Sequence, residues 1–531
     1  MRRVLGWVCA SRLRQMVLLM LVCSAVFLPG LGSTGLSMSE GHRVIPAWEM
    51  LDDARAGEPH WLVPRMFEAV YLRKPPGMMW AIASSSAALG ETEFAARLPS
   101  VFAATLLALS VWFFATRWFG SPWGLAAGLA QALLPVTWPS ARSAEIESLH
   151  MFTTGAASLL VLDMLLRPGE KRGGSSVRGV LLFVLLLGMF LTKGLSGVPF
   201  VAAAAITGAV FLRRSQRWPN SLAIVLAASG AVVLGRALTT HDLGGEPAVM
   251  QGVGAFLWEP GKRLAVVTLG VVVLVTMLPA SLALLFPWGP DAKRERQDAA
   301  RIATRGTPPE IAAQVLAVAS VASLLILTLV GISNPRYGLP ICALLTPMVA
   351  YVARGGWSAL GGEKTRGLQG STPEGAFVSK RPAIARAMFF GSPLAWPIVL
   401  LVAAGIFVGV LEPGRRASSG REAGIALATH LPDGAEVWAD EMIEARPEVL
   451  LYAVREAKRE GRKVRVRWLK PDFMPSDTPE GLLLLLREDD LADEVSRFAA
   501  EQRFGGLTEI TRGEVHKYTF VLCRIEGRKA E

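Results

Sequence analysis

The sequence predicts a polytopic α-helical membrane protein that ends in a soluble α/β domain. Of its 531 residues, 52% are hydrophobic and only 19% are charged, whereas about 25% of the residues in soluble domains are charged. Separate apolar runs of about 20 residues, long enough to cross a bilayer, recur as far as residue 411. Beyond that point the apolar runs become shorter and charged residues become frequent. The change in composition indicates a membrane part followed by a smaller soluble part.

We expect about eleven transmembrane helices in residues 1–411. Four Arg and no acidic residue precede the first apolar run, which indicates a retained first helix with a cytoplasmic end rather than a cleaved signal. The expected spans are 16–35, 98–118, 122–140, 149–167, 178–191, 196–212, 220–237, 264–286, 310–331, 338–354 and 393–411.

The distribution of charge supports this topology. Residues 421–531 carry 18 basic and 22 acidic residues, whereas the first 420 residues carry 37 basic and 22 acidic ones. Much of the basic excess falls in alternate short loops, such as RPGEKRGGSSVR and RRSQRW, as the positive-inside rule requires of cytoplasmic loops. The net charge of +11 therefore reflects membrane topology, and we expect no nucleic-acid partner.

The segments on the other side of the membrane include one long loop at residues 36–97. Within it, residues 75–90 are apolar but too short to span, so we expect a helix along the membrane surface. An odd number of spans places the C-terminal part on this same outer side. We therefore expect a multi-pass membrane protein whose C-terminal domain lies on the outer side of the membrane.

The C-terminal part predicts a small α/β domain at residues 421–531, joined by a polar linker at 412–420. Helical and strand patterns alternate along it, and it has no phosphate-binding loop and no nucleophile elbow. The expected helices are 422–431, 446–459 and 490–503. The expected strands are 435–439, 463–469, GLLLLLRED and KYTFVLCRI.

The notable polar residues cluster in four outer turns, and each turn contributes at least one cation. Two of the turns also contribute carboxylates. The candidate residues are Glu40, His42, Arg43, Lys74 and Arg97 in the first loop, Arg142 and Glu147 in ARSAEIES, Lys193 in FLTKG, and Arg336 and Tyr337 in NPRYGLP. If the helices bundle, these turns converge on one site just outside the bilayer.

Cations and carboxylates in one site suit glycosyl transfer from a lipid-linked donor. Arg and Lys stabilise a phosphate, and more strongly as it becomes the leaving group. A carboxylate takes the proton of the acceptor. The lipid tail would lie between helices, and no nucleotide site is needed.

Five motifs in this order resemble glycosyltransferase family 39: YLRKPPGMMWAIA, FAARLPSVFAATLLAL, ARSAEIES, FLTKG and NPRYGLP. The family has the membrane GT-C fold and includes protein O-mannosyltransferases and the aminoarabinose transferase that acts on lipid A. The resemblance covers roughly residues 10–411. It implies a polyprenyl-phosphate-sugar donor and a reaction outside the bacterial cytoplasmic (inner) membrane, and it does not fix the acceptor. The leading hypothesis is an inverting transferase whose acceptor is a lipid, a glycan or a protein.

The family's functional residues map onto this chain with two departures. Its Asp-Glu pair in the first outer loop falls on Ser39 and Glu40, so the usual Asp is a serine here. Its second acid, an Asp, falls on Glu147. The resemblance therefore implies Glu40 as the base, with Glu147 as the alternative. Lys74 and Arg336 are the candidates for the donor phosphate, and His42 and Arg43 for phosphate or sugar.

Other interpretations stay open at this stage. Glu147 can simply stabilise the start of a helix, Lys193 can extend toward the membrane surface, and Arg97 can anchor its span. A transporter or flippase of a lipid-linked sugar is the alternative function, although the charges lie at helix ends rather than at mid-membrane. No metal-ligand motif occurs and no cofactor is certain, with a divalent ion left open.

Overall fold

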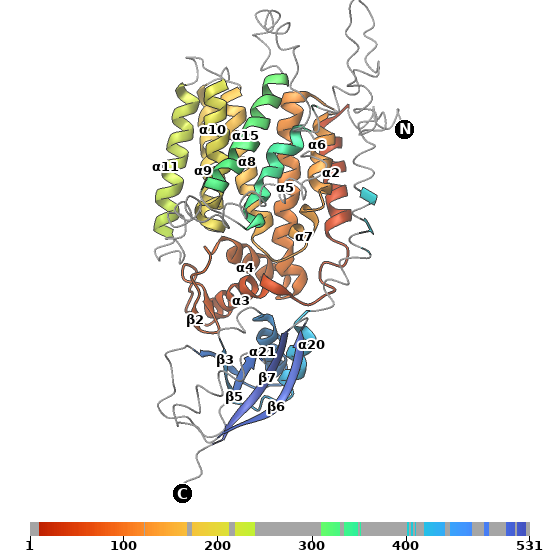
Figure 1. Ribbon diagram of the computed structural model, residues 1–531, viewed down its shortest axis with the longest axis vertical. Coiled ribbons are helices and arrows are strands. Elements are labelled where there is room, and N and C mark those ends of the chain that lie inside the picture. Colours follow the sequence, from red (N-terminus) through yellow and green to blue (C-terminus); the bar gives the residue numbers. More distant parts are fainter. Residues whose placement is uncertain are drawn as a thin grey trace, which may run out of the picture.

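The computed structural model has three tiers: a helical bundle, a thin middle layer, and a C-terminal α/β region (Figure 1). We call the end of the bundle nearest the C-terminal region its lower end, as drawn in Figure 1. The structure describes residues 10–121, 123–166, 172–211, 218–238, 309–329, 334–348, 351, 401–402, 405–406, 409, 419–440, 446–469, 483–487, 506–515 and 518–526.

The bundle is built from apolar helices, the longer of which run between its two ends. They are α2 (Arg12–Phe27), α5 (Glu93–Phe119), α6 (Trp123–Leu133), α7 (Thr137–Ala141), α8 (Glu147–Leu166), α9 (Arg172–Lys193), α10 (Val198–Phe211), α11 (Trp218–Leu238) and α15 (Pro309–Leu329). Among the described residues, four stretches are long and apolar enough to cross a membrane. They are Glu93–Phe119, Glu147–Leu166, Ser176–Val210 and Ile311–Leu329.

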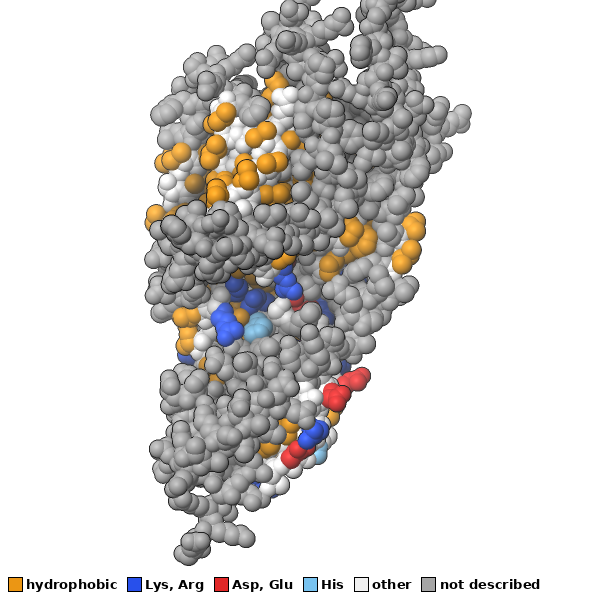
Figure 2. All heavy atoms as spheres, in the orientation of Figure 1, with side chains coloured by type: hydrophobic (Ala, Val, Ile, Leu, Met, Phe, Trp, Pro, Cys, Tyr) orange, Lys and Arg blue, Asp and Glu red, His pale blue; other side chains and the backbone are white. Residues whose placement is uncertain are grey.

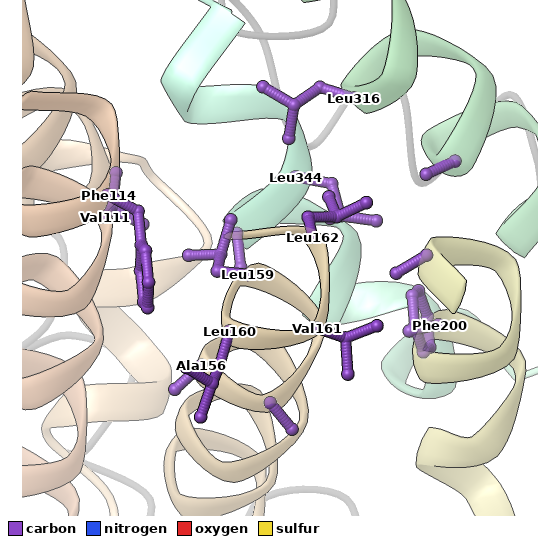
Figure 3. Packing of buried hydrophobic residues seen from close by; sticks show 14 of the residues in the cluster. Val111, Phe114, Ala156, Leu159, Leu160, Val161, Leu162, Phe200, Leu316 and Leu344 are labelled. Atoms are coloured by element: carbon purple, nitrogen blue, oxygen red, sulfur yellow. The ribbon is translucent and has the colours of Figure 1, made fainter. Parts of the chain in front are cut away.

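Helix α8 is the centre of the bundle. Its side chains Leu159, Leu160, Val161 and Leu162 pack against α5, α10, α15 and the segment around Leu344 (Figure 3). Because apolar neighbours surround it, nearly all of α8 is buried. A helix enclosed on every side has a fixed position, so the residues at its N-terminus are held rigidly at the lower end.

Most of the expected spans that fall on described residues are helical, with different bounds. The expected span 122–140 is broken into α6 and α7, and Thr137 donates a hydrogen bond to the Gln131 carbonyl at the break. The span expected to start at 338 begins with the 3₁₀ helix η5 (Pro335–Ile341). The expected span 264–286 lies outside the described residues, as does most of 393–411.

The middle layer closes the lower end of the bundle. It contains the 3₁₀ turn η1 (Met38–Glu40), α3 (Gly41–Arg55), the short hairpin β1 (Arg65–Met66) and β2 (Ala69–Val70), and α4 (Gly77–Leu89). The helix expected along the membrane surface at 75–90 corresponds to α4. Figure 1 shows α3 and α4 crossing below the bundle, between it and the C-terminal sheet.

Among the described residues, the C-terminal region holds a five-stranded sheet with strand order β4-β3-β5-β7-β6 and two helices. The elements are α20 (Arg421–Ala428), β3 (Glu436–Asp440), α21 (Glu448–Arg459), β4 (Arg465–Leu469), β5 (Leu483–Arg487), β6 (Gly506–Val515) and β7 (Tyr518–Glu526). β3 pairs in parallel with β4 and β5, whereas β7 is antiparallel to both β5 and β6. Strand β6 was not predicted, and the expected helix 490–503 lies outside the described residues.

Candidate active site

Turns from distant parts of the chain meet at the lower end of the bundle. The turn of residues 142–146, here the Glu145 turn, leads into α8, while Lys193 ends α9 and Arg336 lies in η5. Arg336 Nη1 lies 3.0 Å from Glu145 Oε2, and Lys193 Nζ lies 3.6 Å from Glu147 Oε1. The predicted convergence of the second, third and fourth outer turns is therefore present in the structure.

Two carboxylates form the acidic part of this site. Glu145 and Glu147 are separated by one residue at the start of α8, where the helix dipole favours negative charge. Ser39 Oγ donates a hydrogen bond to Glu145 Oε1 at 2.8 Å, and Arg336 Nη1 also lies 4.0 Å from Glu147 Oε1. The side chain of Glu145 is 14% exposed and that of Glu147 is 9% exposed, so both are largely shielded from water.

The cations of the site differ in their access to solvent. The Lys193 side chain is only 4% exposed, and its ammonium lies over the ring of Tyr337, 4.1 Å from the centroid. The Arg336 side chain is 48% exposed. Lys193 is thus fixed between Glu147 and Tyr337, while Arg336 is partly open to an incoming ligand.

Lys74 is brought toward this cluster by a close contact between α4 and α9. A Cβ on Gly77 would lie 2.7 Å from the Leu191 carbonyl oxygen, so only glycine permits this approach. Pro76, in the helical region of backbone conformation, is the N-cap residue of α4. The charge of Lys74 acts on Lys193, and no ion pair of Lys74 is found within the described part of the chain. Lys74 is therefore a cation at the edge of the site.

Burial and the charge of Glu147 raise the pKa of Glu145 to about 7, against the opposing effects of Arg336 and the Ser39 hydrogen bond. A carboxylate of this pKa changes its protonation near neutral pH. It is well matched to proton transfer, because general bases work best when their pKa lies near the operating pH.

Glu40, predicted as the base, is instead sealed in a structural pair with Arg97. Arg97 is completely buried, and its donors bond both Glu40 oxygens and the carbonyls of Leu31, Thr34 and Gly35, each at 2.8–2.9 Å. Glu40 also accepts from the backbone N–H groups of Ser37 and Ala144.

This pairing corrects two predictions. Glu40 is 2% exposed and both its oxygens are engaged, so its lone pairs do not face an acceptor. Arg97 has five N–H donors, and five hydrogen bonds already use them. The two residues therefore shape the site rather than contact substrate.

The remaining cations of the prediction are also tied to the protein. Arg142 is 3% exposed and donates to the Phe27 carbonyl at 2.8 Å, so it caps the end of α2 rather than facing a phosphate. Arg43 is buried and donates to the Tyr71 hydroxyl at 2.8 Å. The ring of His42 stacks on Tyr71 with centroids 6.0 Å apart. These contacts place Arg43 and His42 in the middle layer and do not test the predicted ligand contacts.

His150 belongs to the site and was missed by the sequence analysis. It lies one turn after Glu147 on α8, is 1% exposed, and its ring nitrogens lie 3.3 Å from Thr154 Oγ1 and 3.4 Å from Ser196 Oγ. Ser196 in turn donates to the Lys193 carbonyl. The Glu-x-x-His spacing could have revealed it, because a His inside a membrane helix is costly and usually functional.

Basic side chains gather at the height of the middle layer on the face shown in Figure 2, with a His side chain among them. No group of three or more His, Cys, Asp or Glu side chains that could hold a metal ion occurs in the part of the chain that the structure describes. The site thus combines Lys and Arg side chains, which can bind a phosphate, with carboxylates.

Comparisons with known proteins show similarity in part of the sequence and in the fold. A family model described as dolichyl-phosphate-mannose-protein mannosyltransferase matches residues 73–236. The crystal structure of ArnT from Cupriavidus metallidurans bound to undecaprenyl phosphate is similar, with a TM-score of 0.60 and 17% identity over 96% of this chain and 98% of that one. The apo form of ArnT also has a TM-score of 0.60, with 17% identity over 95% and 97% of the two chains.

A more distant structure is the oligosaccharyltransferase AglB from Archaeoglobus fulgidus, with a TM-score of 0.42 and 11% identity over 94% of this chain and 73% of that one. No curated protein sequence matches the chain. Residues 73–236 thus match a glycosyltransferase family model, and the chain shares its fold with ArnT.

Proposed function

We propose that the protein transfers a sugar from a polyprenyl-phosphate donor to an acceptor on the outer face of the bacterial cytoplasmic membrane. The acceptor is a lipid, a glycan or a protein, and the sugar a hexose or a pentose. The observation that carries the proposal is the meeting of Lys193 and Arg336 with Glu145 and Glu147 at one end of an apolar bundle. The undecaprenyl phosphate named for the ArnT structure supports this class of donor.

In the proposed reaction, Lys74, Lys193 and Arg336 hold the donor phosphate. The bond between the anomeric carbon and the phosphate oxygen breaks, and the electron pair leaves with polyprenyl phosphate. The acceptor oxygen attacks from the opposite face, so the configuration inverts. The cations stabilise the departing phosphate because its charge increases in the transition state.

We assign the proton transfer to Glu145. In the free enzyme its Oε2 is paired with the partly exposed Arg336. A donor phosphate that binds Arg336 would weaken this pair and leave the carboxylate available to the acceptor. Loss of the cation also makes the carboxylate more basic, since a nearby positive charge lowers the pKa of an acid. Glu147 remains ion-paired with Lys193, so this second ion pair of the site stays intact.

The test is a transfer assay in proteoliposomes with polyprenyl-phosphate sugars and membrane acceptors. Glu145→Gln should lower kcat by about 10²–10⁴-fold, the usual range for loss of a general base, while the thermal unfolding midpoint stays close to that of the wild type. Full activity of Glu145→Gln would contradict the assignment. Sugar accumulation in the vesicles without a covalent product would favour a transporter.

A further inference from the structure

We propose that Tyr452, on α21 of the C-terminal region, is a positioning residue for the Glu145 turn and acts through the Arg97–Glu40 pair. This inference rests on the proposed function where activity is the readout, and on the structure alone where the position of the turn is the readout. It gives the C-terminal region a role in building the site.

Tyr452 contacts both the first loop and α5. Its hydroxyl accepts a hydrogen bond from the backbone N–H of Leu36 at 2.6 Å and donates to Glu93 Oε1 at 2.9 Å. The side chain is 8% exposed. A Cβ on Gly35 would lie 3.1 Å from this hydroxyl, so the chain is closely packed around it.

The Gly35–Leu36 segment of the first loop is hydrogen-bonded to Arg97. The carbonyl of Gly35, next to the Leu36 N–H that Tyr452 binds, accepts from Arg97 Nη2 at 2.8 Å. Arg97 lies on α5 one turn after Glu93, the other partner of Tyr452. The hydroxyl of Tyr452 therefore holds the Gly35–Leu36 segment and helix α5, and the Arg97 guanidinium lies between these two.

Arg97 is in turn connected to the Glu145 turn through Glu40. Arg97 bonds both oxygens of Glu40, and Glu40 Oε1 also accepts from the Ala144 N–H at 2.8 Å. Ala144 directly precedes Glu145. Ser39, beside Glu40, donates to the Glu145 carboxylate itself. The position of Glu145 thus depends on the position of Ser39 and Glu40.

Apolar contacts also connect α21 with the first loop and the Glu145 turn. Leu451 and Tyr452 of α21 belong to one apolar cluster with Leu36, Ala144 and Ile146. At the start of α21, a Cβ on Gly41 would lie 2.9 Å from Pro447 Cγ. A shift of α21 would therefore be felt at the Glu145 turn.

A second contact of the C-terminal region with the first loop provides a matched control. Trp468 on β4 donates to the Met66 carbonyl at 3.1 Å, and its ring packs against Phe67 of the hairpin. None of its hydrogen bonds or ring contacts within the described residues reaches Arg97, Glu40 or the Glu145 turn. Tyr452→Phe and Trp468→Phe each remove one hydrogen-bond donor between the two regions and keep an aromatic ring. Trp468 packs against the same apolar cluster, but only Tyr452→Phe removes a group from the hydrogen-bonded route.

The experiment compares both full-length variants with the wild type by hydrogen exchange and by kinetics in proteoliposomes. Tyr452→Phe should raise amide exchange in residues 142–146 about tenfold. It should lower kcat roughly tenfold by displacing the base, with the KM for the donor nearly unchanged. Trp468→Phe should change neither. If Tyr452→Phe fails to fold, Glu93→Gln weakens the same hydroxyl contact and takes the same readouts.

Equal changes in the two variants, or no change in Tyr452→Phe, would overturn the inference. So would faster exchange in the turn with unchanged kcat. A wild-type protein that transfers no sugar would refute the proposed function, while the exchange data would still decide whether Tyr452 holds the turn.

Discussion

Two clusters of charged side chains lie next to each other at the lower end of the bundle, and they differ in the number of charges and in access to solvent. In the Arg97–Glu40 cluster, one cation and one anion are buried, and hydrogen bonds use all the donors of the arginine. In the cluster around Glu145, two carboxylates face two cations from separate turns, and one cation is half exposed. The first arrangement fixes backbone, whereas the second can exchange a partner for a ligand.

The comparison explains why residue type alone does not identify a catalytic residue. Both clusters contain Glu and Arg at the same level of the molecule. The Glu145 cluster has a carboxylate with a pKa near 7 and a cation within reach of solvent, whereas Glu40 and Arg97 are buried and hydrogen-bonded to each other. Access to solvent and the number of interacting charges therefore distinguish the proposed catalytic cluster from the structural one.

The largest effect that tests this contrast is expected from Glu40→Gln. It leaves the buried Arg97 without its counter-charge, so the free energy of unfolding should fall by about 3–5 kcal/mol. Thermal unfolding in detergent measures this loss. Glu456→Gln, at a surface pair on α21, is the control and should change little. A stable but inactive Glu40→Gln would instead return Glu40 to the role of base.

Lys193→Met should act on the reaction rather than on the fold. Methionine keeps the packing over Tyr337 but removes the charge next to Glu147, and kcat should fall by about 10²–10³-fold, as for loss of one transition-state donor. Transfer from a polyprenyl-phosphate sugar measures the effect. Lys458→Met, on the exposed side of α21, is the control. Equal activity of the two variants would mean that Lys193 only fills space.

A smaller effect, on kcat/KM, is expected at Ser39. Glycosyltransferase family 39, which the sequence resembles, usually has Asp at this position. Ser39→Ala removes one hydrogen bond to Glu145, worth about 1 kcal/mol, so kcat/KM should fall about fivefold. Ser39→Asp places a second negative charge beside Glu145 and should raise its pKa further. The pH dependence of kcat/KM measures both changes. Higher activity of Ser39→Asp at neutral pH would show that residue 39 can itself serve as the base.

The sequence predicted the architecture well where apolar pattern decides it. The long apolar runs form the helices α5, α8 and α15, because a helix satisfies its backbone hydrogen bonds internally in a bilayer or an apolar core. Strand β6 was missed because GLTEITRGEV is a polar edge strand with no clear alternation. The break between α6 and α7 was also missed, since buried hydrogen bonds such as that of Thr137 fix it.

The site was predicted in part, for a similar reason. Outer turns with cations could be found from topology, and Lys193, Glu147, Arg336 and Tyr337 do meet. The burial of Glu40 could not be foreseen, because it depends on Arg97, which lies 57 residues away. The one-dimensional pattern shows which residues share an end of the bundle but not which donors are already used.

The most direct test of the central claim is the pH dependence of kcat/KM, which reports ionisation in the free enzyme. Because Glu145 acts deprotonated, activity should rise with pH through about pH 7, where the pKa of Glu145 lies. Removing the negative charge of Glu147 with Glu147→Gln should lower this pKa and move the rise to lower pH. Removing the cation with Arg336→Gln should move it to higher pH. A rise centred near pH 4 to 5, the ordinary range of a carboxylate, and unmoved by either variant would contradict the account.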